Sequence, residues 1–235
     1  MNVPILVCGF LGAGKSDLVT KLTDAGFVAS ELEGLSAPSV ANVPKDTRII
    51  AIVDCANFGR QWDDPLIGPL LRRQIGASGL VALSRADLAD PEPVRAILSN
   101  TGPGSVVNNT EVTENLNLLL ETTLGTPGPE DNLHNAFESW SYQGPARMRP
   151  DRAERLAEDR PKGLVRLVAR IATDAAGVEI QIAGRVRQTA PISAREQTEI
   201  TAIWPVGVVR RSAMDLWFAE AVADSSHGFG MFNYR

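Results

Sequence analysis

Short apolar runs alternate with amphipathic segments along the first half of the chain. The apolar runs predict buried strands over residues 3–8, 27–30, 48–53, 79–83 and 105–107. The amphipathic segments predict helices over residues 17–24, 65–75, 91–100 and 112–123. Because strands that alternate with helices form a parallel sheet covered on both faces, we expect an α/β domain over residues 1–124.

The hydrophobic pattern changes after residues 125–132, which are rich in glycine, proline and polar residues and are typical of a linker. Further along, apolar and alternating runs predict strands over residues 137–142, 164–172, 178–182, 199–204 and 206–209. Helices are predicted over residues 150–157 and 213–223. We therefore expect a smaller α+β domain over residues 133–235, with a split β-α-β arrangement.

The amino-acid composition indicates which broad class of protein to expect. Apolar residues make up 44% of the chain and charged residues 22%, which is ordinary for a soluble globular protein. No apolar run is long enough to span a membrane and no basic-then-apolar leader is present, so a cytoplasmic protein is expected. The two cysteines, Cys8 and Cys55, imply neither a disulfide framework nor a zinc site.

Charge is unevenly distributed along the chain. The net charge is −5, which argues against a general nucleic-acid binder. Residues 1–132 carry 9 basic and 16 acidic side chains, whereas residues 133–235 carry 14 basic and 12 acidic ones.

The residues with the clearest chemistry lie at 9–16, Gly-Phe-Leu-Gly-Ala-Gly-Lys-Ser, between a predicted strand and a predicted helix. Gly, four residues and then Gly-Lys-Ser is a phosphate-binding pattern, in which backbone N–H groups point at phosphate oxygens. The helix N-terminus adds a favourable field for the anion. The phosphate contacts are expected from Gly9, Gly12, Ala13, Gly14, Lys15 and Ser16. The alternative is a glycine-rich turn without a ligand.

Within this pattern, Lys15 is expected near the outer phosphates and the Ser16 hydroxyl on Mg²⁺. Polar residues also follow other predicted strands, among them Glu31, Asp54 and Asp87. Ligands of parallel sheets bind at the carboxyl ends of the strands, so these side chains can converge on one site.

Several further segments follow in a characteristic order: Glu-Leu-Glu-Gly-Leu-Ser-Ala-Pro at 31–38, Ile-Val-Asp at 52–54 with Asn-Phe at 57–58, Gln-Ile at 74–75, Leu-Ser-Arg-Ala-Asp-Leu at 83–88 and Arg-Pro-Lys-Gly at 160–163. Together with residues 9–15, they resemble the CobW-type P-loop GTPases, a family of metallochaperone-like and cobalamin-pathway accessory proteins. The resemblance covers nearly the whole chain. It implies a P-loop domain that binds GTP with Mg²⁺, followed by the family's C-terminal domain.

Two family features are missing from the interval between Ser16 and Glu31, which is only about 15 residues long and includes an ordinary helix. The first switch region has no room there, and the family's Gly-Cys-x-Cys-Cys metal motif is absent. Any metal at the nucleotide is therefore expected to be oxygen-bound Mg²⁺.

Asp17 replaces the threonine that the family places within reach of the α-phosphate. Two unit charges about 4 Å apart at an effective dielectric of 20 repel by roughly 4 kcal/mol, so a carboxylate there disfavours phosphate. The alternative is that Asp17 caps the helix N-terminus and occupies the anion site itself.

The segment 84–87 stands where the family carries its guanine-reading Asn-Lys-x-Asp. Asp87 can accept from guanine N1–H and N2–H₂, Arg85 can stack its stem on the base, and Ser84 is shorter than the expected asparagine. We expect weakened guanine selectivity, supplemented by Asn108 or Asn109. The alternative for Asp87 is an N-cap of the following turn.

Catalytic and metal roles remain for several acidic and basic residues. Glu31 and Glu33 are candidates for orienting the attacking water, and Glu31, together with Ser16 and Asp54, for holding Mg²⁺. The alternatives are a solvated surface charge for one glutamate and a strand-end cap for Asp54. Arg72 and Arg73 are candidates for an arginine finger. The alternative is that they lie on a solvent-exposed helix face.

The sequence thus predicts a CobW-like nucleotide-binding protein that uses GTP, or ATP, and Mg²⁺ with slow or impaired hydrolysis. It would act as a switch or chaperone toward a protein client or metal-dependent partner, with neither nucleic acid nor membrane as a partner. Two other classes compete with this prediction. One is a P-loop remnant that survives as an interaction module; the other, favoured least, is an ATP-dependent small-molecule kinase.

Overall fold

The computed structural model describes residues 3–39, 43, 46–101, 105–115 and 133–223. The chain divides into two compact units, Met1–His134 and Asn135–Arg235, and each is described by itself. The predicted linker at 125–132 lies outside the described residues. No helix in the described part of the chain is long and apolar enough to cross a membrane.

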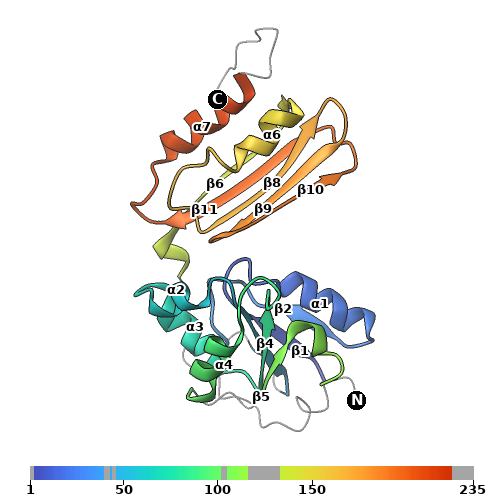
Figure 1. Cartoon of the computed structure of the whole chain (residues 1–235), viewed down its shortest axis with the longest axis vertical. Coiled ribbons are helices and arrows are strands. Elements are labelled where there is room, and N and C mark those ends of the chain that lie inside the picture. The colour runs from blue at the N-terminus through green and yellow to red at the C-terminus, as the bar shows by residue number, and fades with distance from the viewer. Residues whose placement is uncertain (1–2, 40–42, 44–45, 102–104, 116–132, 224–235) are drawn as a thin grey trace. The chain divides into compact units, whose positions relative to one another are not determined.

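The first unit is built on a five-stranded sheet in which neighbouring strands run parallel. Its strands are β1 (Ile5–Cys8), β2 (Ala29–Glu31), β3 (Arg48–Asp54), β4 (Leu80–Ser84) and β5 (Ser105–Asn108). Their order across the sheet is β2-β1-β3-β4-β5. Figure 1 draws this sheet, in which β1, the strand that precedes the glycine-rich loop, lies between β2 and β3. The parallel strands β2 and β3 end at Glu31 and Asp54, so these two residues lie at the same edge of the sheet.

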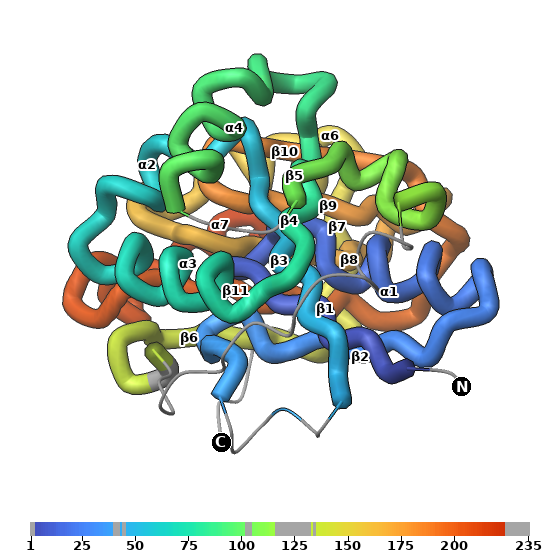
Figure 2. The backbone as a smooth tube through the Cα atoms, turned by 90° about the horizontal axis from the view of Figure 1, so that it is seen from below, coloured from blue at the N-terminus to red at the C-terminus, as the bar shows by residue number. Residues whose placement is uncertain are grey.

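Helices cover both faces of this sheet. They are α1 (Lys15–Asp24), α2 (Phe58–Asp63), α3 (Ile67–Gly76) and α4 (Glu92–Ser99). Alternate strand residues pack into two separate cores: Ile50 and Ile52 with Leu18 and Leu22 of α1, and the odd-numbered positions of β3 with α3 and α4. Figure 2 shows α1 and α3 on opposite sides of the strands. The α/β fold class predicted from the alternating pattern is confirmed.

The second unit is a mostly antiparallel sheet with two helices. Its strands are β6 (Phe137–Gly144), β7 (Arg147–Met148), β8 (Arg166–Thr173), β9 (Gly177–Ala183), β10 (Val186–Ile192) and β11 (Thr198–Pro205), and its helices are α6 (Pro150–Leu156) and α7 (Arg211–Ala223). The order is β10-β9-β8-β11-β6. Because β6 and β8 both pair antiparallel with β11, they run in the same direction with α6 between them in sequence. This is the expected split β-α-β unit.

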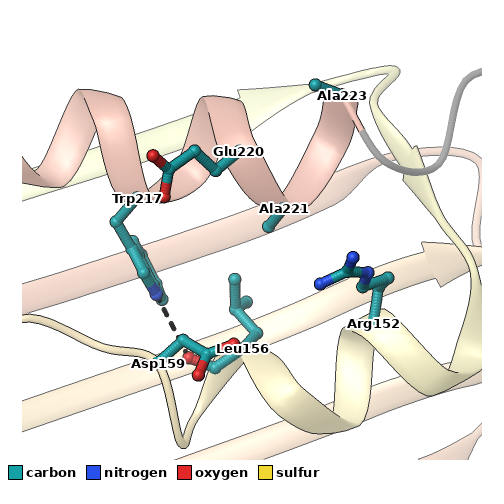
Figure 3. A pocket seen from close by; sticks show the side chains of 7 residues that line it. All are labelled: Arg152, Leu156, Asp159, Trp217, Glu220, Ala221 and Ala223. Atoms are coloured by element: carbon teal, nitrogen blue, oxygen red, sulfur yellow. Dashed lines mark hydrogen bonds between the residues drawn. The ribbon is translucent and has the colours of Figure 1, made fainter.

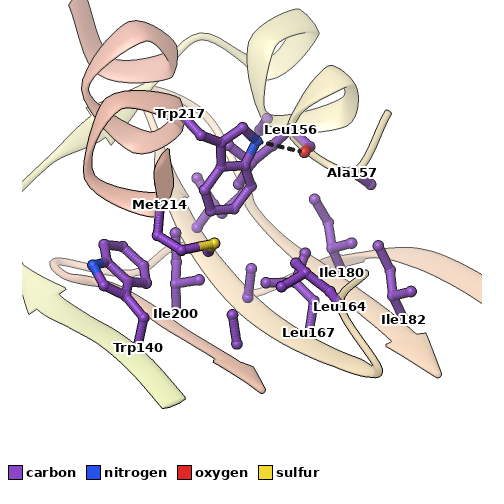
Figure 4. Packing of buried hydrophobic residues seen from close by; sticks show 14 of the residues in the cluster. Trp140, Leu156, Ala157, Leu164, Leu167, Ile180, Ile182, Ile200, Met214 and Trp217 are labelled. Atoms are coloured by element: carbon purple, nitrogen blue, oxygen red, sulfur yellow. Dashed lines mark hydrogen bonds between the residues drawn. The ribbon is translucent and has the colours of Figure 1, made fainter. Parts of the chain in front are cut away.

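Both helices of the second unit lie on one face of its sheet, as Figure 1 shows. Figure 4 shows the apolar core between these helices and the sheet, in which Met214 of α7 lies beside Trp140 of β6 and Ile200 of β11. The indole N–H of Trp217 donates to the carbonyl of Leu156 at the end of α6 (3.2 Å). Beside this contact, α6 and α7 enclose a pocket of about 360 Å³ with polar and apolar walls (Figure 3).

Several sequence predictions differ from the structure. The predicted strand at 206–209 is wrong, because Gly207 adopts φ 77° and Val208 donates to the carbonyl of Pro205 in a turn. The strands β7 and β10 and the short helix α2 were not predicted. Residues 112–115 form turns, and the rest of the helix expected at 112–123 lies outside the described residues.

Candidate functional site

The glycine-rich loop between β1 and α1 has a backbone that requires glycine. Gly9 has φ 149°, and a Cβ placed there would lie 2.5 Å from the carbonyl oxygen of Ile52 on β3. Gly12 and Gly14 also have positive φ, at 76° and 100°. The first intrahelical hydrogen bond of α1 runs from the N–H of Leu18 to the carbonyl of Gly14 (3.1 Å). The N–H groups of residues 15–17 therefore precede the helical ladder, which is the arrangement that anions use at helix N-termini.

Lys15 folds back over this loop. Its side chain is only 8% exposed, and its Nζ donates to the carbonyls of Gly9 (3.2 Å) and Phe10 (3.4 Å). Gly34 borders the same ammonium group, because a Cβ there would lie 3.0 Å from Lys15 Nζ. The loop thus holds a buried cation beside its own backbone, where an anionic group can exchange for the two carbonyls.

Ser16 and Glu31 form the acidic edge of the loop. Parallel pairing places Glu31 of β2 opposite Val7 of β1, and the Ser16 hydroxyl donates to Glu31 Oε2 at 2.8 Å. These are oxygen ligands of the kind that Mg²⁺ prefers, and Mg²⁺ sites commonly combine one carboxylate with water and phosphate. The described residues contain no group of three or more His, Cys, Asp or Glu side chains suited to a metal. The donor set fits Mg²⁺ that is completed by phosphate and water.

Two other acidic candidates lie near this edge. Asp17 points away from the loop: its side chain is 78% exposed and lies 3.9 Å from Lys21, one turn along α1. It therefore does not occupy the anion site in this structure. Glu33 is exposed on the segment after β2, and its backbone carbonyl accepts from the N–H of Ser36 (3.0 Å). The catalytic role of Glu33 stays a prediction.

Asp54 ends β3 in a network of donors. Its side chain is only 2% exposed; Oδ1 accepts from the N–H of Ala56 (3.1 Å), and Oδ2 accepts from Asn57 Nδ2 (2.7 Å). Arg85 Nη1 lies 2.5 Å from the same Oδ2. The structure therefore places Asp54 with Arg85 and Asn57, and its role as a magnesium ligand stays a prediction.

Ser84 ends β4 directly opposite Asp54 in the parallel register. It is 6% exposed, and its hydroxyl lies 2.8 Å from the carbonyl oxygen of Ala13 in the loop and 3.3 Å from that of Val53. The end of β4 is thereby bonded to the middle of the glycine-rich loop.

The two remaining base-reading candidates differ in their surroundings. Asp87 is exposed in the turn that Leu88 N–H closes onto the Arg85 carbonyl (3.1 Å). Asn108 is held at both ends of its amide, since Oδ1 accepts from Arg95 Nη2 (2.8 Å) and Nδ2 donates to Glu111 (2.9 Å). That amide completes a capping box at the end of β5, and a base contact from it stays a prediction.

The sequence analysis named Asn57 and Gln74 only within the segments of the family resemblance and assigned neither of them a role at the site. Asn57 holds Asp54, and Gln74 of α3 donates from Nε2 to the carbonyl of Ser36 (2.7 Å), which ties down the segment after β2. The N–H of Leu133 donates to the carbonyl of Leu35 on the same segment (2.7 Å). Asn57, three residues after a strand-end aspartate, was the one with a local signal; the others depend on distant contacts.

Neither cysteine thiol is a candidate for chemistry at this site. Burial raises the pKa of Cys8 to about 12. Burial, followed by the charge of Asp54, raises the pKa of Cys55 to about 11. Both cysteines therefore stay protonated at neutral pH and behave as small buried hydrophobes.

A parallel sheet with a glycine-rich loop between its first strand and the following helix defines an α/β P-loop domain, followed here by a smaller α+β unit. No model of a known protein family matches the sequence, and no curated protein matches it. Among solved structures, the chain is similar to the crystal structure of the Zn(II)-bound YjiA GTPase from E. coli, with 14% identity, coverage of 93% of this chain and 98% of that chain, and a TM-score of 0.37. A Zn(II)-bound triple mutant of the YjiA GTPase gives 14% identity, 94% and 99% coverage and a TM-score of 0.38. These scores are too low to establish a family, so the function is inferred from the geometry of the site.

Proposed function

We propose that this protein binds a purine nucleoside triphosphate with Mg²⁺ on residues 9–16 and hydrolyses it slowly. The observation that carries the proposal is the buried Lys15, whose ammonium group is held at 3.2 Å from the carbonyl of Gly9 at the head of a helix. A buried ammonium that donates to backbone carbonyls at the head of a helix is suited to exchange them for phosphate oxygens, because hydrogen bonds between two charged groups are the stronger ones.

Each candidate residue at the start of α1 and the end of β2 has a distinct role in this proposal. Lys15 binds the outer phosphates, and the N–H groups of the first turn of α1 bind the phosphates nearer the sugar. Ser16 and Glu31 would hold Mg²⁺, which would supply charge neutralisation for the phosphate oxygens. Glu31 also orients the attacking water, since its second carboxylate oxygen is not used in the bond to Ser16.

The placement of Arg72, one of the two candidate arginine fingers, supports slow turnover. Arg72, a candidate arginine finger, donates from Nη1 to the carbonyl of Trp62 (3.1 Å), and its guanidinium lies 5.2 Å from the centre of the Trp62 ring. Because these contacts anchor its side chain on α2, we infer that Arg72 does not reach the γ-phosphate. An arginine finger raises turnover by about 10³–10⁵ in P-loop enzymes, so hydrolysis without Arg72 in that role is expected to be slow.

The sequence resemblance to CobW-type GTPases supports a role as a nucleotide-dependent switch or chaperone toward a protein client in metal-related metabolism. Thiolate delivery of a metal has no support, because both cysteines of the chain are buried. In this proposal the client recognises the nucleotide-dependent conformation of the protein, and no metal is passed through the cysteines.

A nucleotide-free interaction module is the competing proposal, since Asp17 places a negative charge in the first turn of α1. If this charge abolishes binding, Asp17→Thr restores it by a large factor. We expect a change of less than about threefold, because an exposed carboxylate is well screened by solvent.

Calorimetric titration of the full chain with GTP and ATP in the presence of Mg²⁺ tests the proposal. Lys15→Met is expected to weaken binding about 10- to 100-fold, the effect of removing a charged hydrogen-bond donor. Lys162→Met, the same change at an exposed lysine of the second unit, is the matched control and leaves binding unchanged. A folded wild-type chain that binds neither nucleotide refutes the proposal.

A further inference from the structure

We propose that Gln74 of α3 is a positioning residue for the terminal phosphate. Its buried side-chain amide holds the turn at residues 33–36 beside Lys15, so that losing the amide weakens binding of a nucleoside triphosphate and spares binding of a diphosphate. This inference rests on the proposed function and deepens it, because it names a residue that makes the site respond to the terminal phosphate.

The turn at residues 33–36 borders the ammonium group of Lys15. The N–H of Ser36 donates to the carbonyl of Glu33 (3.0 Å), which closes the turn. Gly34 lies inside it, and a Cβ on Gly34 would lie 3.0 Å from Lys15 Nζ. Because the lysine of a phosphate loop reaches the outer phosphates, this turn lies on the side of the site that the terminal phosphate would occupy.

Gln74 connects this turn to the start of the phosphate loop. Its Nε2 donates to the carbonyl of Ser36 (2.7 Å). Its own backbone carbonyl accepts from the thiol of Cys8 (3.6 Å), the residue that directly precedes Gly9. One residue of α3 therefore contacts both the entry of the loop and the turn, and it sets the separation between the two.

The other half of the Gln74 amide points to a role besides stability. The side chain is fully buried, and no residue in the described part of the chain donates a hydrogen bond to its Oε1. A buried acceptor without a partner costs free energy, which an apolar side chain of the same shape would avoid. The Ser36 carbonyl is only partly buried, so water can replace the lost donor in such a variant. Gln74→Met is therefore expected to fold as stably as the wild type.

Calorimetric titration of the full chain tests the inference by comparing GDP and ADP with their non-hydrolysable triphosphate analogues, each with Mg²⁺. Gln74→Met is expected to weaken the triphosphate analogues about three- to tenfold, the effect of one hydrogen bond, and to change the diphosphates by less than about twofold. Gln61→Met is the matched control, because Gln61 of α2 is also buried (7% exposed), and it should leave all affinities unchanged.

Gly34→Ala tests the same turn independently of Gln74. The φ of Gly34 is not positive, so alanine there adds only a Cβ, which would crowd Lys15 Nζ. The variant is expected to weaken the triphosphate analogues more than the diphosphates. An unchanged ratio of the two affinities would contradict the role given to the turn.

Equal weakening of diphosphates and triphosphates in Gln74→Met, or no change in either, overturns the inference. A Gln74→Met chain that fails to fold also overturns it, since Gln74 would then be required by the core. A wild-type chain that binds none of the nucleotides refutes the proposed function instead. Hydrogen exchange of the Ser36 N–H then tests the positioning role alone: exchange must be faster in Gln74→Met than in the wild type and in Gln61→Met, and equal rates refute it.

Discussion

Arg85→Met removes the guanidinium from Asp54 and keeps most of the apolar stem. The Asp54 carboxylate, which is left without this partner, is 2% exposed. Removing one partner of a buried ion pair costs about 3–5 kcal/mol. Two donors remain, the N–H of Ala56 and the amide of Asn57. The Arg85 side chain is also 16% exposed, so water can enter near the vacated position. We therefore expect a loss of about 2–3 kcal/mol in the stability of the first unit.

The paired variant Asp54→Asn/Arg85→Met separates this charge effect from lost packing. It leaves no unpaired charge at the sheet edge, so its expected loss is below about 1 kcal/mol relative to the wild type. Denaturant-dependent hydrogen exchange by mass spectrometry, read on peptides from β3 and β4, measures both losses. Peptides from β8 and β9 in the second unit serve as an internal control and should not change. The reasoning is refuted if Arg85→Met costs under about 0.5 kcal/mol, or if the double variant is no more stable than the single one.

Four further predictions concern the cysteines, the two glutamates after β1 and the second unit. A disulfide reagent at pH 8 is expected to label neither Cys8 nor Cys55 in the folded chain and both after unfolding, because burial raises both thiol pKa values to about 12 and 11; rapid labelling of the native protein contradicts this. The same shifts, from an ordinary value of 9.0, mean that stability is lost as pH rises above 9, and alanine at both positions should flatten that decline. Glu31→Gln is expected to reduce single-turnover phosphate release more than Glu33→Gln, because Glu31 bonds to Ser16; the reverse order would assign the water to Glu33. Thr198→Val is expected to cost about 2–3 kcal/mol of stability in the second unit, measured by a thermal or urea melt. The Thr198 hydroxyl is fully buried, accepts from the Ala172 N–H (2.9 Å) and donates to the Ala146 carbonyl (2.7 Å). An unchanged melt would contradict that role.

The core of the first unit was predictable because its strands are buried on both faces. Such strands are continuous apolar runs, and the run at Arg48–Asp54 sends alternate residues into two different cores. The edge strand β10 carries polar side chains and Pro191, which an edge tolerates, so its sequence gives little sign of a strand. In contrast, 206–209 is apolar enough for a strand, but Gly207 turns the chain there.

The site shows the same division between local pattern and tertiary choice. Its convergence followed from strand ends that share one edge, and the structure brings Ser16 and Glu31 into direct contact. Which partner a long side chain takes depends on the whole fold. Arg85 can stack on a base or pair with a carboxylate, and in the structure it pairs with Asp54 and has a left-handed backbone conformation that the sequence did not indicate.

The hydrogen bond from Leu133 to Leu35 has a mechanical consequence. Leu35 directly follows Gly34, which borders the ammonium group of Lys15, and Leu133 is the penultimate residue of the first unit. Tension applied where the chain leaves this unit therefore acts on the segment beside Lys15, through the consecutive residues Leu35 and Gly34. Cleavage of the chain before Leu133 would separate the donor of this hydrogen bond from the rest of the first unit, whereas cleavage after His134 would leave it attached.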